Sequence, residues 1–351
     1  MKIDYVKAFL LTLAIVLFFT VSLELYWRQR GFVPSHNDDK IIWAMKRKEV
    51  YLPADRATVF IGSSRIKFDL DIPTWEKLTG EEVIQLAVVG TSPRPVLRDL
   101  SADEKFKGKL VIDVVEGLFF SPRTFISEKW AMDGINYFHE ETPAQQASAI
   151  LNYGLESNVV LLEEGKFGLN NMLNDLELPD RPGVFSFPSF PKEFVVSTAD
   201  RQSSMTPMFL SNPAFIEKQI LNWTKLGGTD KTPGIEGPAL EAVFREVKDA
   251  VDKIRARGGH VIFVRPPSSG GFLETENLVY PRAKYWDAML KYTNTPGIHF
   301  EDYPKTANMV CPEWSHLAPA DVITYTEELV RILSQEKGWS FRGMDAVRQD
   351  L

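Results

Sequence analysis

The chain has 351 residues, of which 44% are hydrophobic and 25% are charged, which is typical of a folded protein with one large or two small domains. A formal net charge of −7 and the lack of a basic run argue against nucleic acid as a partner. The single cysteine, Cys311, excludes an intrachain disulfide, and the five histidines are scattered without zinc-site spacing. The composition therefore implies neither a metal site nor another cofactor.

Residues 8–25 are almost wholly apolar, which is near the lower limit of length for crossing a bilayer. Tyr26 and Trp27 follow as interfacial aromatic residues. A cleaved signal peptide is the alternative, but residues 23–27 offer no small-x-small cleavage site. We therefore expect residues 1–30 to form an uncleaved, single-pass anchor. A long following domain crosses the membrane largely regardless of flanking charge, so residues 31–351 are expected on the extracytoplasmic or periplasmic side.

Runs typical of strands and helices alternate through the first third of the chain. Short β-branched or apolar runs bounded by turn residues predict strands, and longer amphipathic runs predict helices. We expect Asn37 or Asp38 to cap the first helix of the domain, because both are good N-cap residues. The expected elements are a helix within 37–50, strands at 57–61, 83–88 and 110–115, and a helix at 95–106.

The same alternation returns near the C-terminus. The apolar residues of 240–254 recur at helical spacing and are followed by two glycines, which predicts an amphipathic helix. Between the two parts, residues 119–238 have the least regular pattern, and we expect them to form a cap-like insertion near a site. The remaining expected elements are strands at 260–264 and 298–301 and a helix at 319–333.

Strands that alternate with helices predict an α/β protein with a parallel five-stranded sheet. The carboxyl ends of parallel strands lie along one edge, where open α/β sheets place their sites. Polar or turn residues follow the predicted strands at that edge. They are Ser64, Gly90, Glu116, Arg265 and the loop with Glu313 and His316.

Ser64, His316 and Glu313 are the parts of a nucleophilic acyl-transfer site. A serine hydroxyl is a weak nucleophile at neutral pH and needs an adjacent base, which an acid orients. His316 is the preferred base, since imidazole titrates near pH ~6.5. Glu313 is close enough in sequence to receive the other ring N–H. Either short motif alone is weak evidence, because a surface acid with a loop histidine, or a simple turn, is the commoner explanation. Both motifs at strand ends, in this order and with a closing helix after the histidine, favour the catalytic interpretation instead.

In these motifs the chain resembles the SGNH (GDSL-like) hydrolase family. Gly62-Ser63-Ser64 is similar to that family's Gly-Asp-Ser block, and Glu313-Trp314-Ser315-His316 to its Asp-x-x-His block. The resemblance implies a flavodoxin-like three-layer fold with strand one between strands two and three. It also implies that Ser64 is the nucleophile and that Gly90, after strand two, joins the Ser64 backbone N–H in an oxyanion hole.

Two positions depart from the family pattern. Glutamate replaces aspartate at Glu313, although either acid serves a catalytic triad. The asparagine that the family places after strand three is absent, and Glu116 lies there instead. Such a donor to an oxyanion can contribute roughly 3–4 kcal/mol.

Arg265, Glu116 and Trp314 are further candidates for substrate binding. Arg265 could bind an anionic or carbonyl group, with a structural salt bridge as the equal alternative. Trp130, Trp223 and Trp314 could form a sugar platform, although core packing is favoured for all but Trp314, which lies beside His316.

The sequence therefore predicts a serine esterase or O-acyltransferase of the cell membrane, acting on acylated envelope glycans or other small esters. A membrane-bound acyltransferase would be a compatible partner. The alternative is a non-catalytic envelope protein of the same fold that binds a glycan or a partner protein, which the two departures favour.

Overall fold

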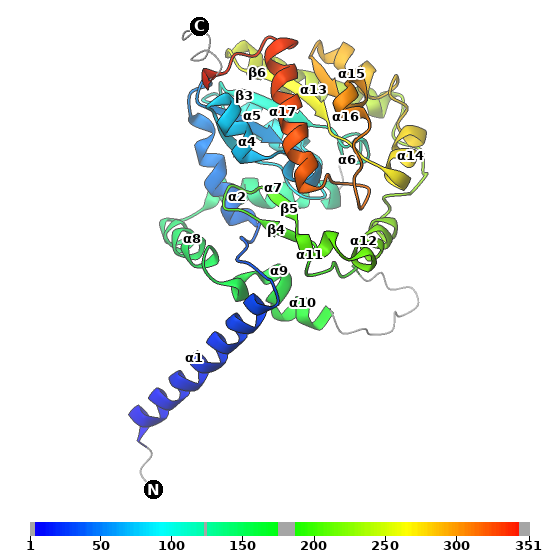
Figure 1. The fold of residues 1–351 in the computed structure, drawn as a ribbon. Coiled ribbons are helices and arrows are strands. Elements are labelled where there is room, and N and C mark those ends of the chain that lie inside the picture. Colours follow the sequence, from blue (N-terminus) through cyan, green and yellow to red (C-terminus); the bar gives the residue numbers. More distant parts are fainter. Residues whose placement is uncertain (1–3, 123–124, 175–186, 344–351) are drawn as a thin grey trace.

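The computed structural model describes residues 4–122, 125–174 and 187–343. Its centre is a five-stranded sheet with the order β2-β1-β3-β6-β7, and all four strand pairs are parallel (Figure 1). Both the parallel sheet and the place of β1 between β2 and β3 confirm the sequence-based expectation. The strands are β1 (Ala57–Ile61), β2 (Glu82–Gln85), β3 (Lys109–Asp113), β6 (His260–Arg265) and β7 (Gly297–His299).

Alternate residues of each central strand pack on opposite faces of this sheet. In β1, Val59 and Ile61 belong to one buried cluster, whereas Phe60 belongs to another. Burial of each such side chain contributes on the order of 1.5–3 kcal/mol. Helices α5 (Arg94–Ala102), α13 (Pro238–Ala256) and α15 (Trp286–Thr293) supply the first cluster, and α4 (Ile72–Thr79) and α17 (Pro319–Gln335) supply the second.

The long helix α13 shows how the sequence pattern produces this packing. Its residues Leu240, Val243, Phe244, Val247, Val251 and Ile254 are all buried, as their spacing predicted. Pro238 occupies the first turn, where a missing N–H costs nothing, and Gly258 follows the helix with φ +89°.

Residues 119–238 are more regular than we expected. The described part is mainly helical, and the sequence pattern missed this because several of its helices bury only one or two residues. Residues 123–124 and 175–186 of this segment lie outside the described residues. The elements are α7 (Phe125–Glu140), α8 (Pro143–Glu156), η2 (Val160–Leu162), α9 (Glu164–Phe167), α10 (Leu169–Asn174), β4 (Val195–Ser197), β5 (Ser203–Met205), α11 (Pro207–Leu210) and α12 (Pro213–Lys225).

The first helix of the domain, α2 (Lys40–Arg47), is capped by Asp39, so our expectation of Asn37 or Asp38 was wrong. Both are bound elsewhere: Asn37 donates to Glu156, and Asp38 accepts from Arg201 at 2.7 Å. Arg201 also donates to two carbonyl groups at the end of β2. The segment between the N-terminal helix and α2 is therefore bound to the domain.

Other boundaries differ by a few residues. β2 ends at Gln85, three residues earlier than predicted, and η3 (Phe300–Asp302) replaces the end of the predicted last strand. Helix α14 (Gly270–Val279) was not predicted, because it begins with two glycines. The remaining short elements are η1 (Lys48–Tyr51), α3 (Ser64–Phe68), α6 (Glu116–Phe119) and α16 (Pro304–Ala307).

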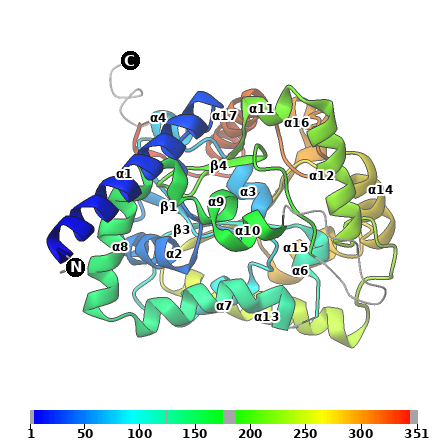
Figure 2. The ribbon, with the colours of Figure 1, turned by 90° about the horizontal axis from the view of Figure 1, so that it is seen from below.

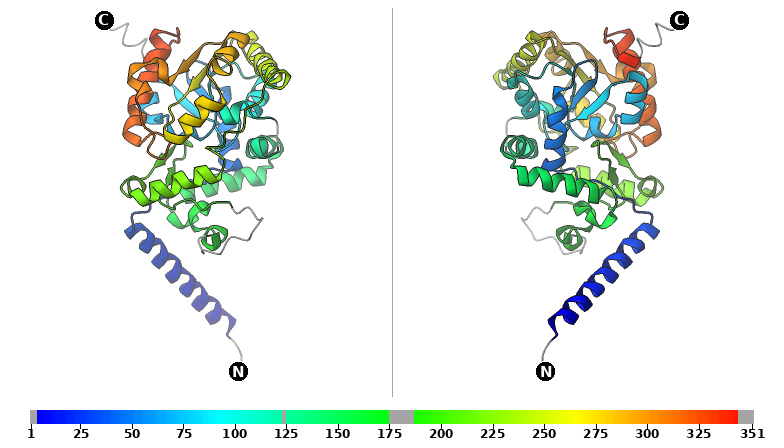
Figure 3. Two further views of the ribbon diagram at one scale, coloured as in Figure 1. Left: turned by 90° about the vertical axis from the view of Figure 1, so that its right-hand side faces the viewer. Right: turned by 90° about the vertical axis from the view of Figure 1, so that its left-hand side faces the viewer.

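Helix α1 (Tyr5–Gln29) projects from the domain, and its 25 residues make it long and apolar enough to cross a membrane (Figures 1 and 3). At 1.5 Å per residue it is about 37 Å long. Its last turns are attached to the domain. Glu24 accepts hydrogen bonds from the backbone N–H groups of Val160 and Leu161 at 3.0 and 3.1 Å, and Trp27 packs on Phe167.

Candidate active site

The chain leaves β1 through Gly62 and enters α3 at Ser64. A Cβ atom at Gly62 would lie only 2.4 Å from the Cβ atom of Asp113, so this close approach requires glycine. Ser63 caps α3, and its N–H and Oγ both donate to Asp113 Oδ2, at 2.9 and 3.0 Å. Ser64 is half-buried, and its hydroxyl makes no hydrogen bond to a described residue. The hydroxyl of Ser64 is therefore free to react, whereas that of Ser63 is engaged.

Glu313 and His316 form the contact that the sequence predicted. The ring Nδ1 and the backbone N–H of His316 both lie 2.8 Å from Glu313 Oε1. An ionised carboxylate only accepts hydrogen bonds, so Nδ1 carries the proton of a neutral ring. The other nitrogen, Nε2, then has a lone pair and can accept a proton.

The expected hydrogen bond between Ser64 Oγ and His316 is not formed, because His316 Nε2 is buried and makes no hydrogen bond. The ring of His316 instead stacks on Phe68, with 4.1 Å between ring centroids and 23° between planes. Phe68 lies one helical turn after Ser64, so both side chains lie on the same face of α3. The His316 ring therefore packs on the face of α3 that carries Ser64, but no hydrogen bond joins the two residues.

Trp223 of α12 completes the environment of Glu313. Its indole N–H donates to Glu313 Oε2, the oxygen that His316 leaves open. The rings of Trp223 and Phe194 also lie 6.0 and 6.2 Å from the His316 ring. The imidazole is consequently enclosed, and His316 is only 1% exposed.

Two buried carboxyl groups lie behind this face of α3. Asp69 accepts from the backbone N–H of Leu317 at 2.9 Å, while its Oδ2 and the Oδ1 of Asp113 make no hydrogen bond. Burial raises the pKa of Asp113, and it raises that of Asp69 well above the ordinary value.

Arg265 and Glu116 bind each other rather than an open space. Arg265 Nε donates to Glu116 at 3.1 Å, and its Nη2 donates to Glu276 at 2.6 Å. Glu276 also pairs with Arg65. Burial raises the pKa of Glu276, but the two arginines outweigh it and hold that pKa below its ordinary value. These contacts favour the salt-bridge interpretation of Arg265.

Gly90 and the tryptophans occupy different positions around the site. Gly90 is exposed with φ +65°, and its N–H makes no hydrogen bond to a described residue. Trp130, which is 49% exposed, has a ring atom 3.3 Å from where a Cβ on Gly90 would lie. Trp314 is half-buried and packs against Gly270. The exposed aromatic beside the site edge is therefore Trp130 rather than Trp314.

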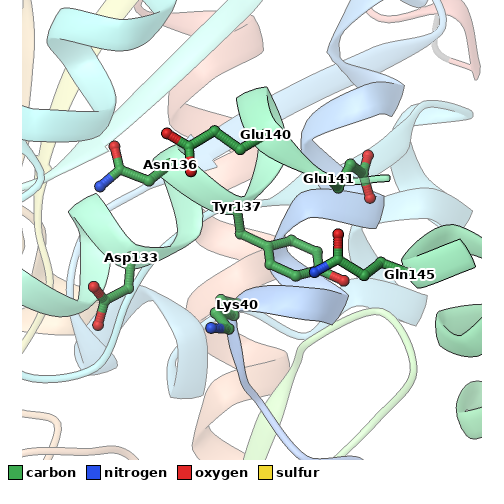
Figure 4. A pocket seen from close by; sticks show the side chains of 7 residues that line it. All are labelled: Lys40, Asp133, Asn136, Tyr137, Glu140, Glu141 and Gln145. Carbon is green, nitrogen blue, oxygen red and sulfur yellow. The ribbon is translucent and has the colours of Figure 1, made fainter. Parts of the chain in front are cut away.

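A separate hollow of about 280 Å³ lies on the surface beside α7 (Figure 4). None of the predicted site residues lines it. Its lining residues are Lys40, Asp133, Asn136, Tyr137, Glu140, Glu141 and Gln145. Among the described residues, no group of three or more His, Cys, Asp and Glu side chains is arranged to hold a metal ion.

Sequence reasoning missed Phe68, Asp69, Asp113 and the role of Trp223. Asp113 had a signal, since it is a charged residue inside the apolar strand predicted at 110–115, and Phe68 follows Ser64 at helical spacing. Nothing local marked Trp223 as a partner of Glu313. A scan against family models finds no match to this chain, and a search of curated proteins finds none either.

Proposed function

We propose that the chain is a membrane-anchored serine esterase or O-acyltransferase of the SGNH type. The observation that supports this most directly is the Glu313–His316 pair, which lies on the same face of α3 as an unbonded Ser64 hydroxyl. The strand order and the helices on both faces of the sheet agree with a flavodoxin-like three-layer fold. Residues 119–238 would then be a cap-like insertion that supplies Trp223.

In the proposed reaction, Ser64 Oγ attacks the carbonyl carbon of an acyl ester while His316 Nε2 takes the hydroxyl proton. Glu313 holds the ring through Nδ1 and stabilises the imidazolium. The N–H groups of Ser64 and Gly90 donate to the oxyanion. His316 returns the proton to the leaving alcohol, and water or a sugar hydroxyl then accepts the acyl group from Ser64.

The free N–H groups of Ser64 and Gly90 support this oxyanion hole, because neither donates to another described residue. The exposed ring of Trp130 beside Gly90 supports a sugar ring as part of the substrate, since aromatic faces pack well on sugars. We place the domain on the extracytoplasmic side, where acylated envelope glycans and a membrane-bound acyltransferase partner would be accessible.

A non-catalytic envelope protein that binds a glycan or a protein is the second candidate. The observation that favours it is the enclosure of His316, whose Nε2 does not reach Ser64. The salt bridge between Glu116 and Arg265, where the family has its asparagine, favours it as well.

Labelling with a fluorophosphonate probe distinguishes the two candidates. The full-length protein in detergent is treated with the probe, and the modified peptide is mapped by mass spectrometry. We expect a label on Ser64 that is lost in Ser64→Ala and retained in Ser63→Ala, because the Ser63 hydroxyl is engaged by Asp113. Absence of label from a folded protein would support the non-catalytic candidate.

A further inference from the structure

The segment 143–174 carries an exposed surface that is unusually apolar. Helix α8 has no charged residue between Pro143 and Leu155 and buries only Ala149. Among residues 143–174 as the structure describes them, Glu164 is the one charged side chain that is exposed. The apolar surface consists of the exposed side chains of Ile150, Leu151, Leu155, Leu162, Leu169, Met172 and Leu173.

A helix facing water normally carries charged residues on its outer face. The side of α8 opposite Ala149 instead contains Leu151 and Leu155 among small residues. Leu151 is 69% exposed, and Leu169 at the start of α10 is 71% exposed. A group of exposed apolar side chains this large is typical of an interaction site.

This surface adjoins the last turns of α1. Figure 2, seen from below, shows α1, α8, α9 and α10 on the side of the molecule that faces the viewer, in front of the sheet. Glu24 binds the N–H groups of η2, which bears Leu162, and Trp27 packs on Phe167 of α9. Glu24 precedes Trp27 by three residues, so η2 meets α1 about 4.5 Å closer to its apolar part than the tryptophan does.

Tryptophan in a spanning helix marks the boundary between lipid and water. Because η2 meets α1 on the apolar side of Trp27, the exposed Leu162 of η2 lies close to the depth of that boundary. Arg28 of α1 adds a further contact with the domain, since it donates a hydrogen bond to the carbonyl group of Asn158, just after α8. The surface and the anchor are therefore held in one fixed arrangement.

We propose that the apolar surface of α8, η2 and α10 lies in the lipid–water interface of the membrane that α1 spans. The occupant is the bilayer itself, and the proposal rests on α1 as a spanning helix, independently of any catalytic activity. Because α1 keeps the apolar surface at a high effective concentration next to the lipid, weak apolar contacts suffice to hold it there.

The test uses the full-length protein in phosphatidylcholine vesicles, in a Cys311→Ala background. Single cysteines replace Leu151 or Leu173 and carry a bimane label. The matched control is Leu278→Cys on α14, where the native side chain is 60% exposed. We expect nitroxide-bearing lipids to quench the labels at 151 and 173 several-fold more than at 278, and aqueous iodide to quench them less.

Iodide quenching at 151 and 173 equal to that at 278 would overturn the proposal. So would protection from iodide without quenching by nitroxide lipid, accompanied by disulfide cross-linking of Leu151→Cys between chains, which would identify a second copy as the occupant. Adding Leu151→Glu and Leu155→Glu to the label at 173 should lower its lipid quenching. An unchanged melting temperature of this variant would show that the fold persists.

Discussion

The carboxyl group of Asp69 accepts a hydrogen bond from the backbone N–H of Leu317 at 2.9 Å. Asp69 directly follows α3, the helix that begins with Ser64, and Leu317 directly follows His316. One buried hydrogen bond therefore ties the proposed nucleophile's helix to the loop of the proposed base.

The stability of Asp69→Asn relative to that of the native protein should increase as pH rises. Burial raises the pKa of Asp69 well above 3.8, so the folded state retains a proton that the unfolded state releases. The native protein thus loses stability as pH increases from about 4 towards the raised pKa, by up to about 1.4 kcal/mol per pH unit. Melting temperatures of both proteins between pH 4 and 8 measure this difference.

Asp69→Ala is the comparison variant. It also removes the buried carboxyl group, but it leaves the N–H of Leu317 unpaired, which costs about 1–3 kcal/mol. Asp69→Ala should therefore be less stable than Asp69→Asn at every pH. Equal stability of the two would show that the hydrogen bond to Leu317 contributes little.

Gly62→Ala should destabilise the fold at the entrance to α3. The added Cβ would lie 2.4 Å from the Cβ of Asp113, which has little freedom to move at the end of a central strand. We expect a loss of roughly 1–3 kcal/mol. The control is Gly154→Ala within α8, where an added Cβ meets no atom within 4 Å and should stabilise by up to about 1 kcal/mol. Thermal unfolding in detergent compares the two variants.

Ser64→Ala and His316→Ala should each remove most esterase activity on a small acyl ester. The double variant should lose little more, because the members of a triad act as a unit. Glu313→Gln should retain more activity than either, since nucleophile and base both remain. Activity is measured as kcat/KM with equal amounts of folded protein. Full activity in Ser64→Ala would contradict the proposed mechanism.

Trp223→Phe tests the contact between α12 and the site. Phenylalanine keeps an aromatic ring beside His316 but removes the N–H that binds Glu313 Oε2. The unpaired buried carboxylate oxygen should cost about 1–3 kcal/mol of stability. A less firmly held Glu313 should also alter the pH dependence of kcat. Leu221→Ala, at an exposed position of the same helix, is the control and should change neither stability nor that pH profile.

Full-length protein should sediment with membranes and resist extraction by carbonate at high pH, because α1 is long and apolar enough to span. A chain that begins near Gly31 lacks the span and should stay in the supernatant. If carbonate alone releases the full-length protein, α1 does not span the membrane.

Local patterns in the sequence predicted the central elements well. β1 has the predicted bounds, Ala57–Ile61, because a short apolar run between turn residues allows few alternatives. The contact of Glu313 with His316 was predictable for a similar reason, since the two residues are three positions apart. Side-chain contacts between distant segments were not predictable in this way.

The pairing of Arg265 illustrates this limit. The sequence left a salt bridge and substrate binding equally open. Glu276, which decides between them, lies in α14, a helix whose two initial glycines hide it from pattern-based prediction. Trp223 was obscured similarly, because its helix buries few residues and its partner Glu313 lies 90 positions away.

The hydrogen bond between Asp38 and Arg201 limits how far the domain can move relative to α1. Ten loose residues between α1 and α2 would have an end-to-end distance of about 17 Å and would let the domain turn freely. Here Ser35 and His36 of that stretch form hydrogen bonds with the backbone of Ser197, so the linker is fixed on the domain. The domain turns only when its anchor turns. Molecules carried in the membrane and molecules free in solution must therefore approach it from different, fixed directions.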